Sequence, residues 1–420
     1  MSLPAYLNYQ DSGTTWLGKV PVHWTVRRLG YFFDERREKV SDRDYQPLSV
    51  TKSGIVPQLE TAAKTDDGDN RKLVRVGDFV INSRSDRKGS AGASALDGSV
   101  SLINTVLCPT SEIDIGFAHH LLRSVPFQEE YYRYGKGIVA DLWSTNYSEM
   151  RNITLAVPGV LEQRAIASFL DRETGKTDAL IAEQEKLLTL LAEKRRETIS
   201  HAVTRGLNPD VPMKDSGVVW LGKVPSHWEI GAVKRFFVSC DGRRVPLSAE
   251  ERGRRLGEYP YYGASGVIDH VDDFIFDEDL VLVSEDGANL LNRSTPIAFI
   301  ARGKYWVNNH AHILQPSDDN LVFWSERIEA INLEPFVTGS AQPKLTIEAL
   351  MNLVISVPPT KEERAAISDF IVSETVKLDA LKAKTEHAVE LLKERRKALI
   401  AAAVTGKIDV RNAVSQELAA

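Results

Sequence analysis

The feature that most constrains this chain is that one pattern occurs in it twice. Residues 11–24 read DSGTTWLGKVPVHW and residues 215–228 read DSGVVWLGKVPSHW, which are identical at 11 of 14 positions with an offset of 204. A second pair follows, because VPGVLEQRAIASFL begins at Val157 and VPPTKEERAAISDFI begins at Val357. Such repeats indicate repeated structural units. We therefore expect the order A–B–A′–B′, in which A is a mixed region and B is shorter and more charged.

The B regions have the pattern of long helices. From Glu162 to Val203, apolar residues recur at steps of three and four among good helix formers, and the stretch from Glu362 to Val404 repeats this style. Proline precedes each stretch and glycine follows it, as is common at helix ends. Each helix would be about 60–65 Å long. One apolar stripe on each predicts that the two helices pack together as a coiled coil.

The A regions predict two mainly β globular domains, so the fold class is α+β. Short β-branched or aromatic runs are separated by Gly, Asp, Asn and Pro, which is typical of strands with long loops. The expected strands cover residues 78–82, 100–107, 280–283 and 297–300. Little helix is evident, apart from residues 116–124 and 321–331. The two domains share their edges and differ in their middles.

Composition excludes several classes of protein. Hydrophobic residues make up 43% and charged residues 26% of the 420 positions, which is ordinary for a globular protein. No apolar run is long enough for a membrane span, and the start has no secretory pattern. Cys108 and Cys240 have no neighbours at metal-ligand spacing, so we expect no disulfide or zinc and a reducing cytoplasm. The net charge of −6 means that any nucleic-acid contact would come from local clusters.

At this point the chain resembles a known family, the specificity subunits of type I restriction-modification systems. The resemblance rests on the WLGKVPxHW openings, on EQRAI at Glu162 with EERAA at Glu362, and on KALIAAAVTGKIDV from Lys397 to Val410. In A′ it also rests on three further segments, residues 262–268, 286–289 and 339–345. In A, residues 135–138 do not reproduce the 339–345 pattern, so we expect the first domain to belong to another subclass.

The resemblance implies a pseudo-twofold protein in which the two helices are antiparallel. Its parts would be a first target-recognition domain (1–156), a helical spacer (157–206), a second recognition domain (207–356), a second spacer (357–412) and a tail (413–420). Each domain would read one half of a bipartite site in double-stranded DNA. Two methyltransferase subunits per chain, and restriction/translocase subunits through the complex, would be its partners. The chain itself would be non-catalytic, without cofactor or metal, and not bound to a membrane.

Polar loops supply the candidate DNA contacts, because Arg and Lys bind phosphates and Arg, Asn and Asp can pair with base edges. The basic loop 82–89 follows a predicted strand, and Asp86 would orient an arginine or accept from cytosine. The candidates are Arg84, Arg87, Lys88, Arg243, Arg244, Arg254, Arg255, Asn289, Asn292, Arg293, Asn309 and Lys344. The alternative for each is an ordinary solvated surface residue.

Other interpretations of the repeated residues remain open. Trp16, His23, Trp220 and His227 fit packing of each domain onto the helices better than chemistry. A metal site at His310 and His312 would need a third ligand that the sequence does not show. The rival functions are a self-contained DNA methyltransferase or nuclease and a coiled-coil scaffold. Against the enzymes, no GxxxxGK[ST] loop occurs, and Pro358 and Pro359 lack the polar and aromatic neighbours of a methyltransferase loop.

Overall fold

The computed structural model describes residues 3–61, 68–84, 87–137, 143–339 and 342–411. The chain divides into two compact units, which are described separately below. Unit 1 combines residues 1–185 with residues 387–420, and unit 2 is the continuous stretch 186–386. The tail 413–420 lies outside the described residues. No helix among the described residues is long and apolar enough to cross a membrane.

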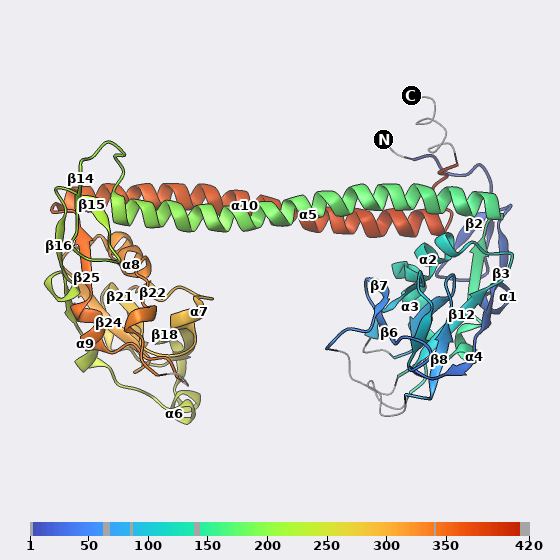
Figure 1. Cartoon of the computed structure of the whole chain (residues 1–420), viewed down its shortest axis with the longest axis horizontal. Coiled ribbons are helices and arrows are strands. Elements are labelled where there is room, and N and C mark those ends of the chain that lie inside the picture. The colour runs from blue at the N-terminus through green and yellow to red at the C-terminus, as the bar shows by residue number, and fades with distance from the viewer. Residues whose placement is uncertain (1–2, 62–67, 85–86, 138–142, 340–341, 412–420) are drawn as a thin grey trace. The chain divides into compact units, whose positions relative to one another are not determined.

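The two predicted long helices are present. Helix α5 covers Val160–Arg205 and helix α10 covers Lys361–Val404 (Figure 1), and α5 continues through Gly175 without a break. Gly206 and Gly406 follow them with φ of 78° and 70°, the left-handed conformation that commonly ends a helix at glycine. The helix bounds agree with the sequence prediction to within two residues at each end.

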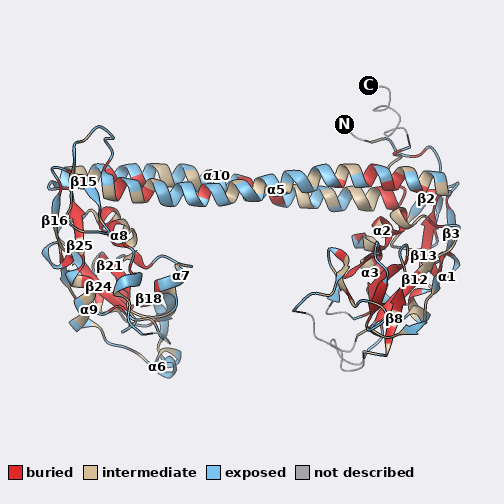
Figure 2. Cartoon of the chain, in the orientation of Figure 1, coloured by how far each residue is buried: buried red, intermediate tan, exposed pale blue. Residues whose placement is uncertain are grey.

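The two helices run antiparallel in each unit, as expected. In unit 1, Arg396 Nε lies 2.7 Å from Asp178 Oδ1 and Lys393 Nζ lies 3.9 Å from Glu185 Oε1, so positions rise along α5 as they fall along α10. In unit 2, Arg195 Nε lies 3.6 Å from Asp379 Oδ1. These exposed pairs contribute little stability. Figure 2 shows that much of the helix surface is exposed or intermediate, whereas the strands of the globular domains are mostly buried.

The first domain is built on a four-stranded sheet of order β10-β9-β12-β4. Its strands are β10 (Ala91–Ala93), β9 (Phe79–Asn82), β12 (Asn104–Pro109) and β4 (Phe33–Glu35). Strand β3 (Thr25–Arg28) pairs with β13 (Thr154–Val157) and joins the start of the domain to its end. The remaining strands are β1 (Tyr9–Asp11), β2 (Lys19–Pro21), β5 (Lys39–Val40), β6 (Leu48–Thr51), β7 (Gly54–Pro57), β8 (Arg71–Val74) and β11 (Gly98–Val100).

The second domain repeats this sheet with order β17-β24-β21-β22. Its strands are β17 (Phe237–Ser239), β24 (Ala311–Pro316), β21 (Leu280–Ser284) and β22 (Ala298–Ala301). Strand β16 (Glu229–Ala232) pairs with β25 (Val354–Val357). A second sheet contains β18 (Leu256–Gly263), β19 (Gly266–Val271), β20 (Phe276–Asp277) and β23 (Lys304–Val307), and β14 (Met213–Asp215) pairs with β15 (Lys223–Pro225). The two domains therefore share the topology of this four-stranded sheet, whereas their remaining strands are arranged differently.

The sequence prediction was wrong in two places. It missed helix α3 (Val125–Arg133), which begins at the N-cap Ser124 with a proline in its first turn. It also read residues 100–107 as one strand, whereas β11 ends at Val100 and β12 begins at Asn104. Helices α2 (Ile115–Arg123) and α8 (Leu321–Glu329) were predicted. The shorter helices are α1 (Leu29–Phe32), α4 (Tyr147–Met150), α6 (Ala249–Arg254), α7 (Asn289–Asn292) and α9 (Ile347–Asn352).

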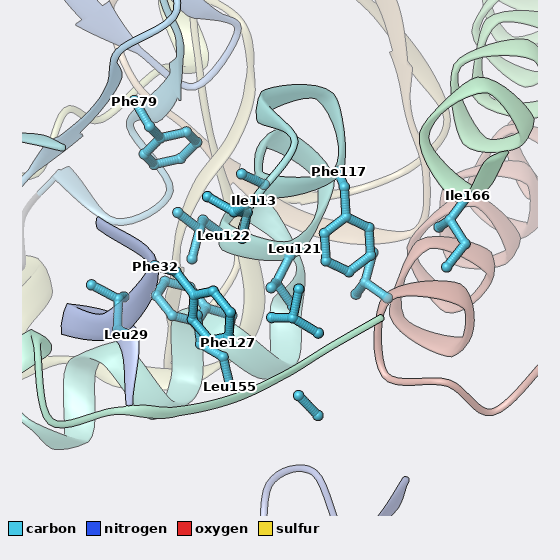
Figure 3. Packing of buried hydrophobic residues seen from close by; sticks show 14 of the residues in the cluster. Leu29, Phe32, Phe79, Ile113, Phe117, Leu121, Leu122, Phe127, Leu155 and Ile166 are labelled. Atoms are coloured by element: carbon cyan, nitrogen blue, oxygen red, sulfur yellow. The ribbon is translucent and has the colours of Figure 1, made fainter. Parts of the chain in front are cut away.

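The core of unit 1 joins the first domain to the long helices. Figure 3 shows Phe117 and Leu121 of α2 near Ile166 of α5, and these three side chains are fully buried. The end of α10 joins the same core through Ala403 and Val404. In unit 2, Ile199 and Val203 near the end of α5, together with Ile367 and Ile371 near the start of α10, belong to the corresponding core. Each domain is thus packed against the beginning of one long helix and the end of the other.

A repeated hydrogen-bonded clamp holds each domain to a helix start. Trp24 Nε1 donates to Glu162 Oε1 over 3.1 Å, and His23 Nε2 lies 2.9 Å from Glu162 Oε2. In unit 2, Trp228 Nε1 donates to Glu363 over 2.9 Å, and His227 Nε2 lies 3.0 Å from the same carboxylate. The expectation that His23 and His227 attach their domains to the long helices is therefore confirmed for both. Two other repeated tryptophans pack inside their own domains, Trp16 against Phe127 and Trp220 against Phe336.

Candidate nucleic-acid interface

Two loops meet at the end of the central strand in each domain. In the first domain, the Ser83 N–H after β9 donates to the Ile103 carbonyl before β12 over 3.2 Å. In the second domain, the Glu285 N–H after β21 donates to the His310 carbonyl before β24 over 2.9 Å. The strand registers agree with this match, because Asn104 pairs with Asn82 and Ala311 pairs with Ser284. The two sites are therefore equivalent in backbone structure.

A third segment completes the site in the same way in both domains. In the first domain, the backbones of Lys136 and Ser144 form an isolated β-bridge, and the Thr145 N–H donates to the Ser83 carbonyl over 3.0 Å. In the second domain, the backbones of Thr338 and Lys344 form the corresponding β-bridge, and the Leu345 N–H donates to the Glu285 carbonyl over 2.8 Å. We call these three-segment sites the first loop cluster (residues 82–84, 101–103, 136–137 and 143–144) and the second loop cluster (285–287, 308–310, 338–339 and 342–344). The residues at 138–142 and 340–341 lie outside the described part of the chain.

This arrangement refines an expectation from the sequence. Residues 135–138 do not resemble the 339–345 pattern, yet both segments make the same backbone bridge beside the central strand. Backbone hydrogen bonds constrain the path of a loop without constraining its side chains. The difference between the two sequences therefore changes what each loop cluster presents, and the scaffold stays the same.

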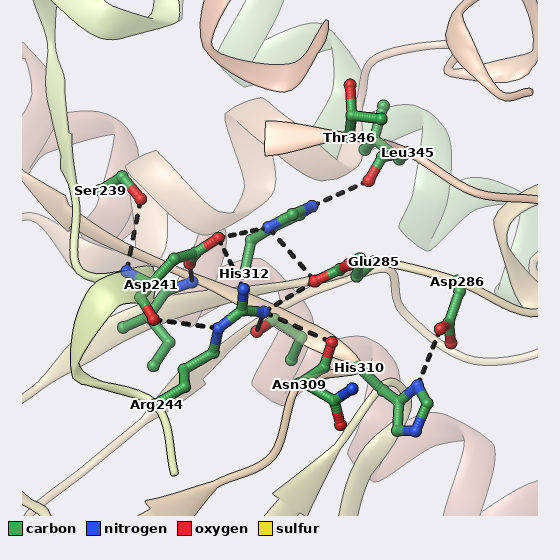
Figure 4. A network of polar contacts seen from close by, with 12 residues as sticks. Ser239, Asp241, Arg244, Glu285, Asp286, Asn309, His310, His312, Leu345 and Thr346 are labelled. Atoms are coloured by element: carbon green, nitrogen blue, oxygen red, sulfur yellow. Dashed lines mark hydrogen bonds and ion pairs between the residues drawn. The ribbon is translucent and has the colours of Figure 1, made fainter. Parts of the chain in front are cut away.

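An ion-paired network supports the second loop cluster (Figure 4). Arg244 Nη1 lies 2.7 Å from Glu285 Oε2. Lys344 Nζ lies 3.1 Å from Glu285 Oε1. His312 Nδ1 lies 2.7 Å from Asp241 Oδ2, and Arg244 Nη2 lies 3.2 Å from the same oxygen. The sequence analysis did not foresee this network, because its members are distant in the chain and polar residues in loops are common. It fixes the loops relative to the sheet.

The charges of the network keep its carboxyl groups ionised. Burial acts to raise the pKa of Asp241, but hydrogen bonds from His312 and the Ile313 N–H, with the charge of Arg244, bring that pKa below its ordinary value. Burial acts in the same direction on Glu285, and the hydrogen bonds from Arg244 and Lys344 lower the pKa of this carboxyl group. Partly buried carboxylates of this kind stabilise a fold while their partners remain in place.

The same network contains the one group of potential metal ligands found in the described residues, namely Asp241, Glu285 and His312. Each of these three side chains is already bound to other groups of the protein. His312 Nδ1 faces Asp241, and His312 Nε2 lies 2.8 Å from the Leu345 carbonyl oxygen. Arg244 and Lys344 supply the positive charge that an ion would bring. The residues therefore fit a protein salt-bridge network and not a metal centre, and His310 is engaged elsewhere with Asp286.

The basic candidates of the first domain flank the first loop cluster. Arg84 is exposed, and its backbone bridges Ser144. Arg87 and Lys88 are exposed as well. Lys88 Nζ lies 2.5 Å from Glu129 Oε1 and 5.0 Å from the centre of the Tyr132 ring, so helix α3 holds it. Asp86 lies outside the described residues. Positive charge is thus available beside the cluster.

Two candidates of the second domain are used inside the protein. Arg244 has only 16% of its side chain exposed and serves the network described above. Arg293 adopts φ of 49°, and its Nη1 donates to the Glu329 carbonyl at the end of α8 over 2.7 Å. Its Nη2 also donates to the Ile331 carbonyl. These guanidinium groups therefore hold loops and a helix end, and they are poor candidates for contact with a ligand.

The other candidates of the second domain are more accessible. Arg243, Arg254 and Arg255 pair with Glu278, Glu250 and Asp272 respectively, and Arg254 remains 75% exposed. Asn289 ties its loop together through Thr295, and Asn292 accepts from the Ser294 N–H. Asn309 is exposed at the second loop cluster, and Lys344 has 52% of its side chain exposed there. Asn309 and Lys344 are thus the candidates that the fold brings to one site.

Comparisons with known proteins agree with this architecture. Residues 225–392 match the family model described as the type I restriction modification DNA specificity domain. A type I restriction enzyme specificity subunit of Haemophilus influenzae is 36% identical over 135 residues, which covers 31% of this chain and 32% of that protein. The specificity subunit of the enzyme MjaVIII from Methanocaldococcus jannaschii is 24% identical over 285 residues, covering 62% of this chain and 63% of that subunit. Each alignment therefore spans less than two thirds of the relative.

Two solved structures share the fold. One, from work on the assembly and conformational transition of a type I restriction-modification system, gives a TM-score of 0.63 at 18% identity and covers 93% of this chain and 99% of its own. The other, the HsdS subunit of Thermoanaerobacter tengcongensis, gives a TM-score of 0.50 at 18% identity and covers 93% and 98%. The family match covers residues 225–392, which include most of the second domain. Over the matched parts, the chain is similar to the specificity subunits of type I restriction-modification systems.

Proposed function

We propose that this chain recognises a bipartite target in double-stranded DNA, with one half read by residues 1–156 and the other by residues 207–356. One observation carries the proposal. The two domains build the same three-segment loop cluster from the same backbone hydrogen bonds and present different side chains on it. A rigid scaffold with variable loops is the usual basis of recognition. Two readers in one chain also bind a two-part target more tightly than either reader would alone.

The chain would direct the chemistry of other subunits. In this proposal, two methyltransferase subunits bind each chain and modify adenines in the recognised target, and restriction/translocase subunits join through the complex. The long helical stretches 157–206 and 357–412 would serve as spacers between the two readers. We propose that the chain is itself non-catalytic and needs no cofactor.

The basic residues would supply the contacts that do not depend on sequence. Lysine and arginine on phosphates set position and affinity, while base edges set specificity. We propose Arg84, Arg87 and Lys88 for the first domain and Lys344 for the second, with Arg243, Arg254 and Arg255 as further phosphate contacts. Because the chain carries a net charge of −6, these local clusters would have to attract the DNA phosphates although the chain as a whole repels them. Binding should therefore weaken steeply as salt rises.

The test is a domain exchange read out by methylation. The chain is co-expressed with the methyltransferase subunit encoded beside it, and modified adenines are mapped across the host genome. Residues 25–156 are then replaced by the corresponding part of a relative. We expect a two-part motif for the original chain and a change in only one part after the exchange. The absence of any motif, or a change in both parts, would contradict the proposal.

A further inference from the structure

The turn before the last central strand occupies the same place in both domains. Residues 101–103 precede β12, and residues 308–310 precede β24. The carbonyl of the third residue in each turn, Ile103 or His310, accepts from the N–H that follows the central strand. By this register Leu102 corresponds to Asn309, and Ile103 corresponds to His310.

An asparagine side chain fixes each turn. In the first domain, Asn104 Nδ2 donates to the Ser101 carbonyl over 3.1 Å, and the Ser83 hydroxyl donates to the Ile103 carbonyl. In the second domain, Asn308 is only 5% exposed, and its Oδ1 accepts from the His310 N–H over 2.8 Å. The backbone of both turns is therefore held in place before any ligand arrives. Such preorganisation reduces the entropy lost on binding.

The exposed side chains on the two turns have opposite chemistry. Leu102 and Ile103 are 41% and 39% exposed, which places two large aliphatic side chains together on a fixed turn. Asn309 is exposed, and His310 has 45% of its side chain exposed. Figure 4 shows Asn309 and His310 next to each other, on the opposite side of the network from Leu345.

The polar turn is oriented by a carboxylate. His310 Nδ1 lies 2.7 Å from Asp286 Oδ2, so the ring can make its further hydrogen bond only through Nε2. The backbone of Asp286 is itself fixed, because it forms an isolated antiparallel β-bridge with Lys344. In the first domain the residue at the place of Asp286 is Arg84, whose backbone bridges Ser144. Asp286 thus acts as a positioning residue for His310, and Ile103 needs no such partner.

Each turn fits a different base edge. The thymine methyl group is the apolar feature of the major groove, and aliphatic side chains recognise it by contact. An exposed asparagine amide matches the N7 acceptor and N6 donor of adenine. We infer that these turns are base-reading elements of the two domains, with Leu102 and Ile103 contacting a thymine methyl group and Asn309 and His310 reading a site that contains adenine. This inference rests on the proposed function, because it assumes that each domain reads half of a DNA target.

Target selection from a pool of random duplexes tests the assignment. The full chain, in complex with its methyltransferase subunit, is compared with the double variants Leu102→Ala/Ile103→Ala and Asn309→Ala/His310→Ala. We expect each variant to lose preference at one or two adjacent positions in one half of the motif and to keep the other half. The positions that are retained within the same half show that the mutated domain is folded. If the original chain selects no motif, the proposed function fails. If it selects a motif and both variants select the same one, this inference alone fails.

Modified bases then test the chemistry. Replacing thymine by uracil in the half read by the first domain removes one methyl group and should weaken binding by the original chain about fourfold. Replacing adenine by 7-deazaadenine in the other half should weaken it about tenfold. The corresponding alanine variant should be insensitive to the same change. Equal sensitivity of the original chain and the variant would overturn the assigned contact.

Matched controls separate reading from general surface effects. Leu96 is another exposed leucine of the first domain, with 36% exposure, and Asn352 is an exposed asparagine at the end of α9 that accepts from Lys234. Leu96→Ala and Asn352→Ala should leave the selected motif unchanged. A loss of the same positions in these controls would overturn the assignment of the turns.

Discussion

The two loop clusters share a backbone and differ in how it is supported. In the second cluster Glu285 pairs with Arg244 and Lys344, so charged side chains hold the loops together. At the equivalent place in the first cluster stands Ser83, which uses its N–H and its hydroxyl on one carbonyl, that of Ile103. The backbone hydrogen bonds therefore define the site, and the side chains around them vary with the surface that each domain presents.

The largest difference is expected when the support is removed from each cluster. Glu285→Ala leaves Arg244 and Lys344 without this partner and should lower the free energy of unfolding by about 2–3 kcal/mol. Ser83→Ala removes one neutral hydrogen bond and should cost about 1 kcal/mol. Urea unfolding of the full chain, with hydrogen exchange to locate the change, measures both. Equal losses would mean that the two clusters are supported alike.

Removing the clamp should reduce stability by a similar amount in both halves of the chain. Glu162→Ala and Glu363→Ala each remove the acceptor for a buried tryptophan and a histidine and should cost about 2 kcal/mol. Glu162 also accepts from the Tyr6 hydroxyl over 2.7 Å, so its loss should be the larger of the two. Glu193→Ala, an exposed position on α5, is the control and should change stability by less than about 0.5 kcal/mol. A large effect at one clamp only would show that the two domains are not held to their helices in the same way.

Acid should weaken the second cluster before it weakens the first. The pKa of Asp241 and the pKa of Glu285 are lowered in the folded chain from ordinary values of 3.8 and 4.5. Their stabilisation is therefore fully present above those ordinary values and is lost as the pH falls below them. The stability difference between the original chain and Glu285→Gln should accordingly shrink between pH 6 and about pH 3.5. An unchanged difference over that range, measured by urea midpoints, would show that Glu285 does not titrate in this way.

The smallest effect is expected from single phosphate contacts. Lys344→Ala and Arg84→Ala should each weaken DNA binding by about 0.5–1 kcal/mol without changing the selected sequence. Each should also reduce the slope of log affinity against log salt by about 0.9. Binding titrations at several salt concentrations provide the measurement, with Arg293→Lys as a comparison that should leave the slope unchanged. A change of motif in either alanine variant would instead assign that residue to base reading.

The sequence predicted the elements whose physics is local. The 3.6-residue periodicity of α5 and α10 is repeated over many turns, and their proline and glycine boundaries reinforce it, so both helices were correctly predicted. The run 100–107 was not, because its apolar residues look continuous while Leu102 and Ile103 form an exposed turn. Helix α3 was missed because its nine residues are mostly polar, charged or aromatic, and aromatic residues are as common in strands as in helices.

The candidate site was predicted in residue type but not in arrangement. The sequence singled out basic and amide residues in the loops as candidate DNA contacts, and the structure places two of them, Asn309 and Lys344, at one site. Their partners come from other parts of the chain, since Arg244 and Glu285 are 41 positions apart. Only the folded sheet brings these groups together. Whether an arginine serves the protein or a ligand therefore depends on tertiary contacts that a single sequence does not specify.

The discontinuous composition of unit 1 has a consequence for synthesis on the ribosome. Residues 186–386 form a continuous unit, so its core can close as soon as residue 386 has emerged. The core of unit 1 includes Ala403, Val404 and Val410, and Gly406 lies against Pro21 and Trp24. The domain that is translated first must therefore wait for residues 403–410 before its core is complete. We therefore expect the second domain to complete its core before the first, against the usual order of folding from the N-terminus, and a product that ends near residue 390 to lack a finished first domain.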